Sequence, residues 1–130
     1  MKAYETRLLW QRTKFVWGET DCIMSVCNHV RQTTGVDPAA PWRGTYSDEA
    51  GAQAIYAAHG GVLGLMRHGM ALAGIATSTS ASAAHDGAVV VCQMGAHEVA
   101  GIVFDRRVGF MFEGQGMIET RAKVLEEWAI

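Results

Sequence analysis

The stretch Trp17-Gly18-Glu19-Thr20-Asp21-Cys22 predicts where a helix begins and which side chain lies at its start. Gly18 permits a tight turn, and Thr20 and Asp21 are residue types that commonly cap a helix N-terminus. Gly35 is a suitable C-cap, and the segment between has apolar residues at helical spacing: Cys22, Ile23, Val26, Cys27 and Val30. The sequence therefore predicts a helix over residues 21–33, with Cys22 in its first turn.

Cys22 would lie at the positive end of the helix dipole, beside backbone N–H groups that have no partner within the helix. Such a place favours the thiolate, the nucleophilic form of cysteine, and lowers a thiol pKa by roughly one to several units from about 8.5. Two interpretations stay open on spacing alone. Cys22 is either a reactive nucleophile or a buried cysteine that packs as a small apolar side chain.

The composition limits the possible functions. A chain of 130 residues with 49% hydrophobic and 18% charged residues predicts one globular domain over residues 1–130. The net charge of −2 and the lack of a Lys/Arg-rich run argue against nucleic-acid binding. We also expect no membrane span, no signal peptide, no metal site and no cofactor, because no long apolar run and no ligand spacing typical of zinc occur.

The hydrophobic period changes from helical to extended near residue 85, which predicts an α+β fold of N-terminal helices packed on a C-terminal antiparallel sheet. The first helix, over residues 3–13, is expected to bury Tyr4, Leu8 and Leu9. An Ala/Ser-rich loop is expected over residues 76–84 and a last helical turn over residues 121–128. The other expected elements are a helix beginning after Ser47, a helix over 62–72, and strands over 88–92, 98–104, 108–112 and 117–119.

The segments Phe15-Val16-Trp17-Gly18 and Asp21-Cys22 resemble the nucleophile motif of the NlpC-like cysteine peptidases, a papain-fold family that cuts bacterial cell-wall peptides. Among these, the chain is most similar to small tailed-phage and prophage proteins. The similarity continues through residues 34–38, residues 43–46, Gly101-Ile102 and the region of Trp128, and so covers nearly the whole chain. It implies a papain-like core with Cys22 as the catalytic nucleophile.

A nucleophilic cysteine needs a histidine within hydrogen-bond reach. In the family this histidine opens the second strand, before a Val-Gly-Ile-like step, and the aligned position here is Val99. His97 is the candidate base, because positions 97 and 99 share a sheet face and lie about 6.6 Å apart along a strand. The alternative is a surface histidine at a strand end. The available candidate for the third residue of the triad is Glu113, which lies just beyond the strand expected over 108–112. The triad is therefore incomplete in the sequence.

Four further residues are candidates for substrate binding. Arg43 could clamp a carboxylate through two hydrogen bonds, but it could equally form a structural ion pair with Asp37 or Asp48. Trp17, Asp21 and Tyr46 complete the set, and Trp17 has the alternative role of packing under the turn before Cys22.

The resemblance leads to two hypotheses of function. The first is a tail-associated cysteine peptidase or amidase of a phage or phage-like particle, which acts on the stem peptide of the bacterial cell wall. The second is a catalytically degenerate tail-tip or tail-assembly protein that keeps the peptidase fold. A module that only binds cell-wall peptide is a more distant third. In the first two hypotheses the protein is made in the host cytoplasm and works in the particle tail, in contact with other tail proteins.

Overall fold

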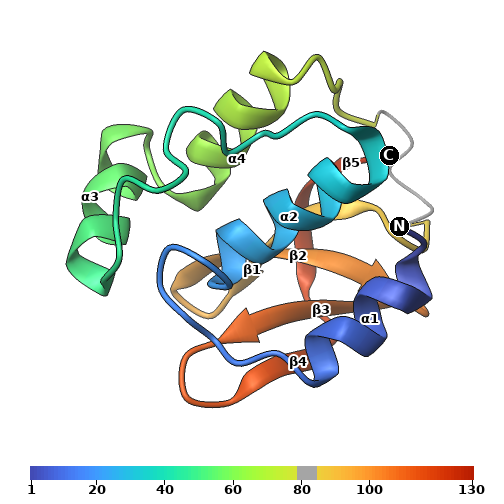
Figure 1. The fold of residues 1–130 in the computed structure, drawn as a ribbon. Helices are drawn as coiled ribbons and strands as arrows, with labels where there is room; N and C mark the ends of the chain where they lie inside the picture. Colours follow the sequence, from blue (N-terminus) through green and yellow to red (C-terminus); the bar gives the residue numbers. More distant parts are fainter. Residues whose placement is uncertain (79–84) are drawn as a thin grey trace.

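A computed structural model describes residues 1–78 and 85–130, and its elements divide at the break between them. Helices precede the break and strands follow it, which confirms the predicted α+β layout (Figure 1). The predicted Ala/Ser-rich loop extends to residues 79–84, which lie outside the described residues. The helices are α1 (Ala3–Gln11), α2 (Cys22–Thr34), α3 (Glu49–Ala58) and α4 (Val62–Leu72). The strands are β1 (Val89–Met94), β2 (His97–Phe104), β3 (Arg107–Phe112), β4 (Gly116–Thr120) and β5 (Lys123–Trp128).

The helix that begins at Cys22 forms as its sequence predicts. The Asp21 side chain caps its start by accepting from the Met24 N–H, and Gly35 ends it with a left-handed φ of 81°. Its residues Ile23, Val26 and Val30 are fully buried. In Figure 1, α2 crosses in front of the sheet, and α1 lies beside it toward β4.

The five strands form one antiparallel sheet in the order β4-β3-β2-β1-β5. Its two edge strands, β4 and β5, are joined only through Arg121 and Ala122, so the sheet must curl to bring its edges together. Side chains therefore fill two cores. One lies between helices and sheet and includes Ala100, Ile102, Phe104 and Met111. The other lies inside the curl and includes Val90, Cys92, Val103, Val108 and Phe110.

Two expectations about the ends of the chain were wrong. Helix α1 leaves Tyr4, Leu8 and Leu9 exposed and buries Thr6 and Trp10 instead. The Trp10 ring packs edge-on against Phe104 at 5.6 Å, and Thr6 Oγ1 lies 2.7 Å from His29 Nδ1 on α2. The partners on the sheet and on α2 therefore decide which face of α1 is buried.

The segment expected as a last helical turn is strand β5. It pairs with β1 from Val89↔Trp128 to Gln93↔Lys123, with an irregularity between Val91 and Cys92. β1 is fully buried over Val89–Cys92, so it needs a hydrogen-bonding neighbour on each side, and the C-terminal segment supplies the second one. Trp128, at the end of this strand, is 1% exposed and lies in the core between helices and sheet.

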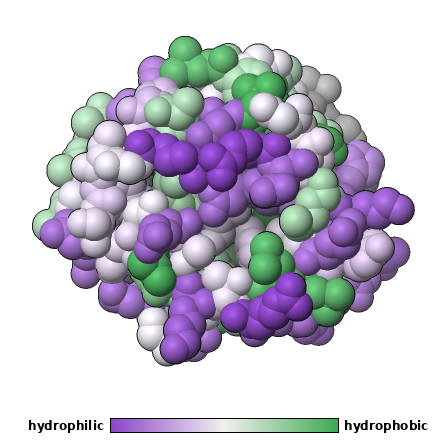
Figure 2. Space-filling model, viewed as in Figure 1, coloured by the Kyte–Doolittle hydropathy of each residue, from purple (hydrophilic) through white to green (hydrophobic). Residues whose placement is uncertain are grey.

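On the face seen in Figure 2, apolar side chains form separate small patches among polar ones. The exposed apolar residues include Tyr4, Leu8 and Val16. This face shows no single apolar area that is continuous across the molecule.

Candidate functional site

A groove of about 940 Å³ lies where the start of α2 meets the sheet and the α3–α4 pair. Its walls come from the turn before α2, from α3, from the start of α4, from the β1–β2 hairpin and from the end of β3. The predicted residues Trp17, Cys22, His97 and Glu113 all line this groove, and Val99 and Tyr56 line it with them. The fold therefore brings the predicted nucleophile, base and third residue to one cavity.

The turn before Cys22 is fixed by a buried carboxylate. Asp21 is fully buried; its Oδ1 accepts from the Met24 N–H at 2.8 Å, and its Oδ2 accepts from the Gly18 N–H at 2.8 Å. Oδ2 also accepts from the Tyr46 hydroxyl at 2.5 Å. Gly18 has a φ of +81°, and a Cβ there would lie 2.2 Å from the Tyr46 carbonyl oxygen, so only glycine fits. Asp21 and Tyr46, which were predicted to bind substrate, hold the turn before Cys22 in this structure.

The Cys22 thiol is half-buried and has few polar neighbours. The Ala100 and Ile23 backbone N–H groups and the Tyr56 hydroxyl lie close to the sulfur and favour its thiolate. Burial outweighs them and, with the negative charge of Asp21, raises the pKa of Cys22 to about 11. The expected lowering of this pKa by the helix start is therefore wrong. The capping carboxylate brings a charge of the wrong sign beside the thiol.

His97 lines the groove without contacting the thiol through a hydrogen bond. It opens β2, is exposed, and pairs with Met94 across the hairpin. Among the described residues, the hydrogen-bonded histidines are His29, with Thr6, and His59, with the Ile55 carbonyl. No imidazole is thus paired with Cys22 in this structure.

Glu113 has a partner other than a histidine. Its Oε2 accepts from the Trp17 indole N–H at 2.6 Å, which joins the end of β3 to the turn before α2 across the groove. The Trp17 ring also packs edge-on against Phe15 at 4.7 Å. Glu113 therefore positions Trp17, and the predicted alternative role of Trp17 in packing near the turn agrees with these contacts.

Arg43 forms the structural ion pair that was its alternative role. Its Nε and Nη2 donate to the two oxygens of Asp37 at 2.7 and 2.9 Å, and its Nη1 donates to Asn28 Oδ1 at 2.8 Å. The Arg43 guanidinium in turn lowers the pKa of Asp37. Arg43 is not among the residues that line the groove.

Two groove residues were not predicted from the sequence. Tyr56, on α3, is buried; its hydroxyl lies close to the Cys22 thiol and has no hydrogen-bond partner among the described residues. Glu98, on β2, accepts from the Leu63 N–H at 3.1 Å and so caps α4, whose own N-cap residue is Gly61. The capping could not be read from α4 itself, since the capping side chain is 35 residues away.

The sheet is open along one side of the groove. Pairing of β2 with β3 runs from Phe104↔Arg107 to Ile102↔Gly109 and goes no further among the described residues. β2 continues to His97, held on its other side by β1, and β3 continues to Phe112, held on its other side by β4. The Cys22 thiol meets the Ala100 N–H within this opening.

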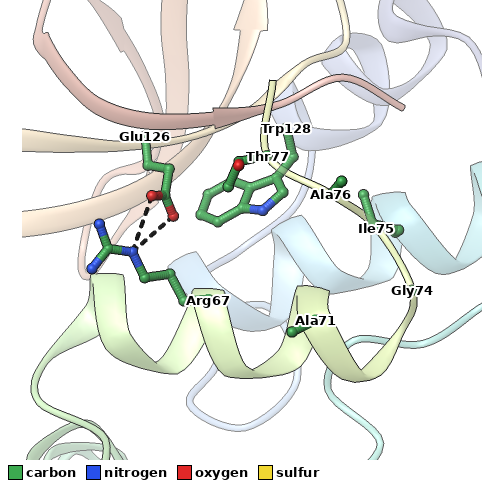
Figure 3. Close-up of a pocket in the computed structure, with 8 residues that line it drawn as sticks. All are labelled: Arg67, Ala71, Gly74, Ile75, Ala76, Thr77, Glu126 and Trp128. Carbon is green, nitrogen blue, oxygen red and sulfur yellow. Dashed lines mark hydrogen bonds and ion pairs between the residues drawn. The ribbon is translucent and has the colours of Figure 1, made fainter. Parts of the chain in front are cut away.

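A second cavity, of about 470 Å³, lies between α4 and β5 (Figure 3). Figure 3 shows Arg67 of α4 and Glu126 of β5 pointing toward one another, with the Trp128 ring beside them. Arg67 Nε donates to both Glu126 oxygens, at 2.9 and 3.0 Å. The charged groups of this cavity are thus paired with each other, and it has none of the candidate catalytic residues.

Within residues 1–78 and 85–130, no helix is long and apolar enough to cross a membrane. The same residues contain no group of three or more His, Cys, Asp or Glu side chains placed to hold a metal ion.

The fold and the groove define an α+β domain in which a cysteine at a helix start faces an opening in an antiparallel sheet. A family model described as a domain of unknown function, DUF6950, matches residues 3–130, and the chain belongs to this family. No curated protein and no solved structure matches the chain.

Proposed function

We propose that this protein has a papain-like, NlpC-type core and is a catalytically degenerate tail-tip or tail-assembly protein of a phage or phage-like particle. The resemblance of the segments around Trp17-Gly18 and Asp21-Cys22 supports the core. So does the packing of the Cys22 helix against the β2–β3 side of the sheet. Its partners would be other tail proteins, and it would reach the tail from the host cytoplasm as part of the particle.

The observation that carries the degenerate assignment is the surroundings of the thiol. Cys22 has two backbone N–H groups and a tyrosine as polar neighbours, and Val99 lines the groove where the resemblance implies a histidine. With a pKa of about 11, only about one thiol in ten thousand is ionised at pH 7. A cysteine peptidase depends on that ionised form, so this environment favours binding over bond cleavage.

The test is hydrolysis of purified cell-wall peptide by the wild type and by Val99→His. The account predicts no release of stem peptide by the wild type. It predicts a gain in the variant, because position 99 is half-buried in the groove wall and a histidine there restores the pattern of the family. Val124→His, on the exposed side of β5 outside the groove, is the matched control. Wild-type hydrolysis that Cys22→Ala abolishes would overturn the degenerate assignment.

A working cysteine peptidase is the second candidate, and one observation favours it: Cys22, His97 and Glu113 line a single groove. In this alternative Cys22 attacks the amide carbonyl of the stem peptide, and His97 accepts the thiol proton and returns it to the leaving amine. The Ala100 N–H would stabilise the oxyanion. Cys22→Ala and His97→Ala should then each remove nearly all activity, because a nucleophile and its base act as a unit.

The proposed place in a particle has its own test. Intact particles, purified from a host that carries the gene, should contain this chain when their proteins are identified by mass spectrometry. Its consistent absence from particles with complete tails would reject the structural role in the tail and leave the groove without the proposed setting.

A further inference from the structure

We infer that the opening between β2 and β3 binds an extended segment of a partner protein, made of L-residues and carrying Lys or Arg, which adds to the free edge of β2 as a strand. The inference rests on the proposed function, since it names the kind of partner that a non-catalytic groove would hold.

The free edge is defined by the hydrogen bonds of β2. Val103 donates to the Ala88 carbonyl at 3.0 Å and accepts from the Gly87 N–H at 2.8 Å, so its peptide groups point toward the β1 side. Peptide groups alternate in direction along a strand, so those of Glu98 and Ala100 point the other way, into the opening. The Ala100 N–H lies beside the Cys22 thiol. The Glu98 N–H and C=O and the Ala100 C=O remain for a partner.

An unpaired strand edge of this kind is a template for another strand. Proteins usually cover such an edge or blunt it with charge, but here β3 diverges from β2 after Gly109 and leaves the edge facing a groove. The groove also has apolar side chains on the two diverging strands, at Val99, Phe110 and Phe112. Phe112 is 46% exposed. An extended peptide would thus find backbone partners on β2 and apolar surface around them.

The charges of the groove decide which peptide fits. Its described lining residues include Glu49, Glu98 and Glu113, and none of them is a lysine or an arginine. Glu98 is partly compensated by the start of α4 and Glu113 by the Trp17 indole, but Glu49 and Glu113 are exposed, and no ion pair among the described residues involves them. A basic side chain on the bound segment would complement this field. A D-residue in an extended segment turns its side chain to the opposite face from an L-residue, so a protein segment of L-residues matches the alternating faces of a strand better than a stem peptide that contains D-residues.

The probe for this inference is an N-acetylated, C-amidated hexapeptide of alternating L-valine and L-lysine, titrated into the whole ¹⁵N-labelled protein. We expect shifts of amide signals in residues 97–100 and 110–112. At saturation, exchange of the Glu98 amide hydrogen should slow by at least about tenfold, since binding gives this N–H a partner. N-methylation of alternate amides of the peptide should weaken binding about tenfold, as expected for the loss of about one hydrogen bond.

Glu49→Gln tests whether the negative charge of the groove contributes to peptide binding, and Glu5→Gln is its control. Both residues are exposed glutamates in the first turn of a helix, α3 and α1, but only Glu49 lines the groove. Glu49→Gln should weaken binding about threefold and Glu5→Gln should not. The inference is overturned if the Val/Lys peptide does not bind at millimolar concentration, if the N-methylated peptide binds equally well, or if only a D-residue stem peptide binds. None of these outcomes depends on hydrolysis, so the proposed loss of catalysis can stand or fall separately.

Discussion

The two walls of the groove differ in how their polar groups are used. On the helix wall, both Asp21 oxygens are occupied by Gly18, Met24 and Tyr46, so the turn that presents Cys22 is held from three directions. On the strand wall, the Glu98 peptide group and the Ala100 carbonyl point away from β1 into the opening, where no described strand pairs with them. The difference indicates that the groove keeps a rigid cysteine turn while its open surface is suited to binding a chain.

The largest expected effect comes from breaking the helix wall. Asp21→Ala should lower the free energy of unfolding by about 4 kcal/mol, because it removes a helix cap and leaves the part-buried Tyr46 hydroxyl and Gly18 N–H without partners. Urea unfolding measures this change. Asp48→Ala is the control, since Asp48 caps α3 at the surface through one bond to Gly51. That variant should lose only about 1 kcal/mol, and equal losses would show that the wall around Asp21 is not specially held.

The next largest effect depends on pH and concerns His29, a buried residue of α2. His29 is 3% exposed, and burial lowers its pKa from 6.5 to about 4, so the folded protein keeps the imidazole neutral. The stability that the neutral His29 contributes is complete above pH 6.5 and is lost as the pH falls toward 4. Over this range the unfolded chain binds a proton at His29 and the folded chain does not, so acid favours unfolding. The loss should reach about 3 kcal/mol.

Denaturant unfolding at pH 7 and pH 4.5 measures this loss, with His29→Gln and the exposed His68→Gln compared. His29→Gln should be less stable than the wild type at pH 7 and should lose less stability on acidification. His68→Gln should follow the wild type at both pH values. A wild-type pH dependence that survives in His29→Gln would place the titrating group elsewhere.

Much of this fold was predictable from the sequence where the signals are local. The helix over Val62–Leu72 was predicted with the bounds that it has in the structure, and the Asp21-Cys22 helix start was predicted from its cap. The buried face of α1 was not predictable, because Trp10 meets Phe104 and Thr6 meets His29, and both partners lie far along the chain. β5 was missed for the same reason, since its strand form depends on pairing with β1.

The candidate site divides in the same way. The position of Cys22 at a helix start could be predicted, and His97, named as its candidate base, lines the same groove in the structure. The state of the thiol could not be predicted, because it depends on burial and on the charge of the capping Asp21. Neither the place of Tyr56 beside the groove nor the open edge of β2 could be predicted, because each depends on how segments far apart in the sequence pack together.

The smallest effect concerns Arg43, which the structure places outside the groove. Arg43→Ala should lower the free energy of unfolding by about 1 kcal/mol, because it removes the partly buried, bidentate ion pair with Asp37. Binding of the Val/Lys hexapeptide should not change. Arg67→Ala removes the more exposed ion pair with Glu126 and should have no measurable effect on unfolding. If Arg43→Ala lost peptide binding, Arg43 would have to belong to the binding site.

The rate of Cys22 alkylation by iodoacetamide as a function of pH tests the central claim, that the helix start holds this cysteine without activating it. Peptide mass mapping separates Cys22 from Cys27 and Cys92 in the wild-type protein. With a pKa of about 11, the Cys22 rate should rise about tenfold per pH unit from pH 6 to pH 9 without reaching a plateau. It should stay about a hundredfold below that of a free thiol at pH 7. A plateau below pH 8, or a rate at pH 6 above that of free cysteine, would contradict the account and identify Cys22 as an activated nucleophile.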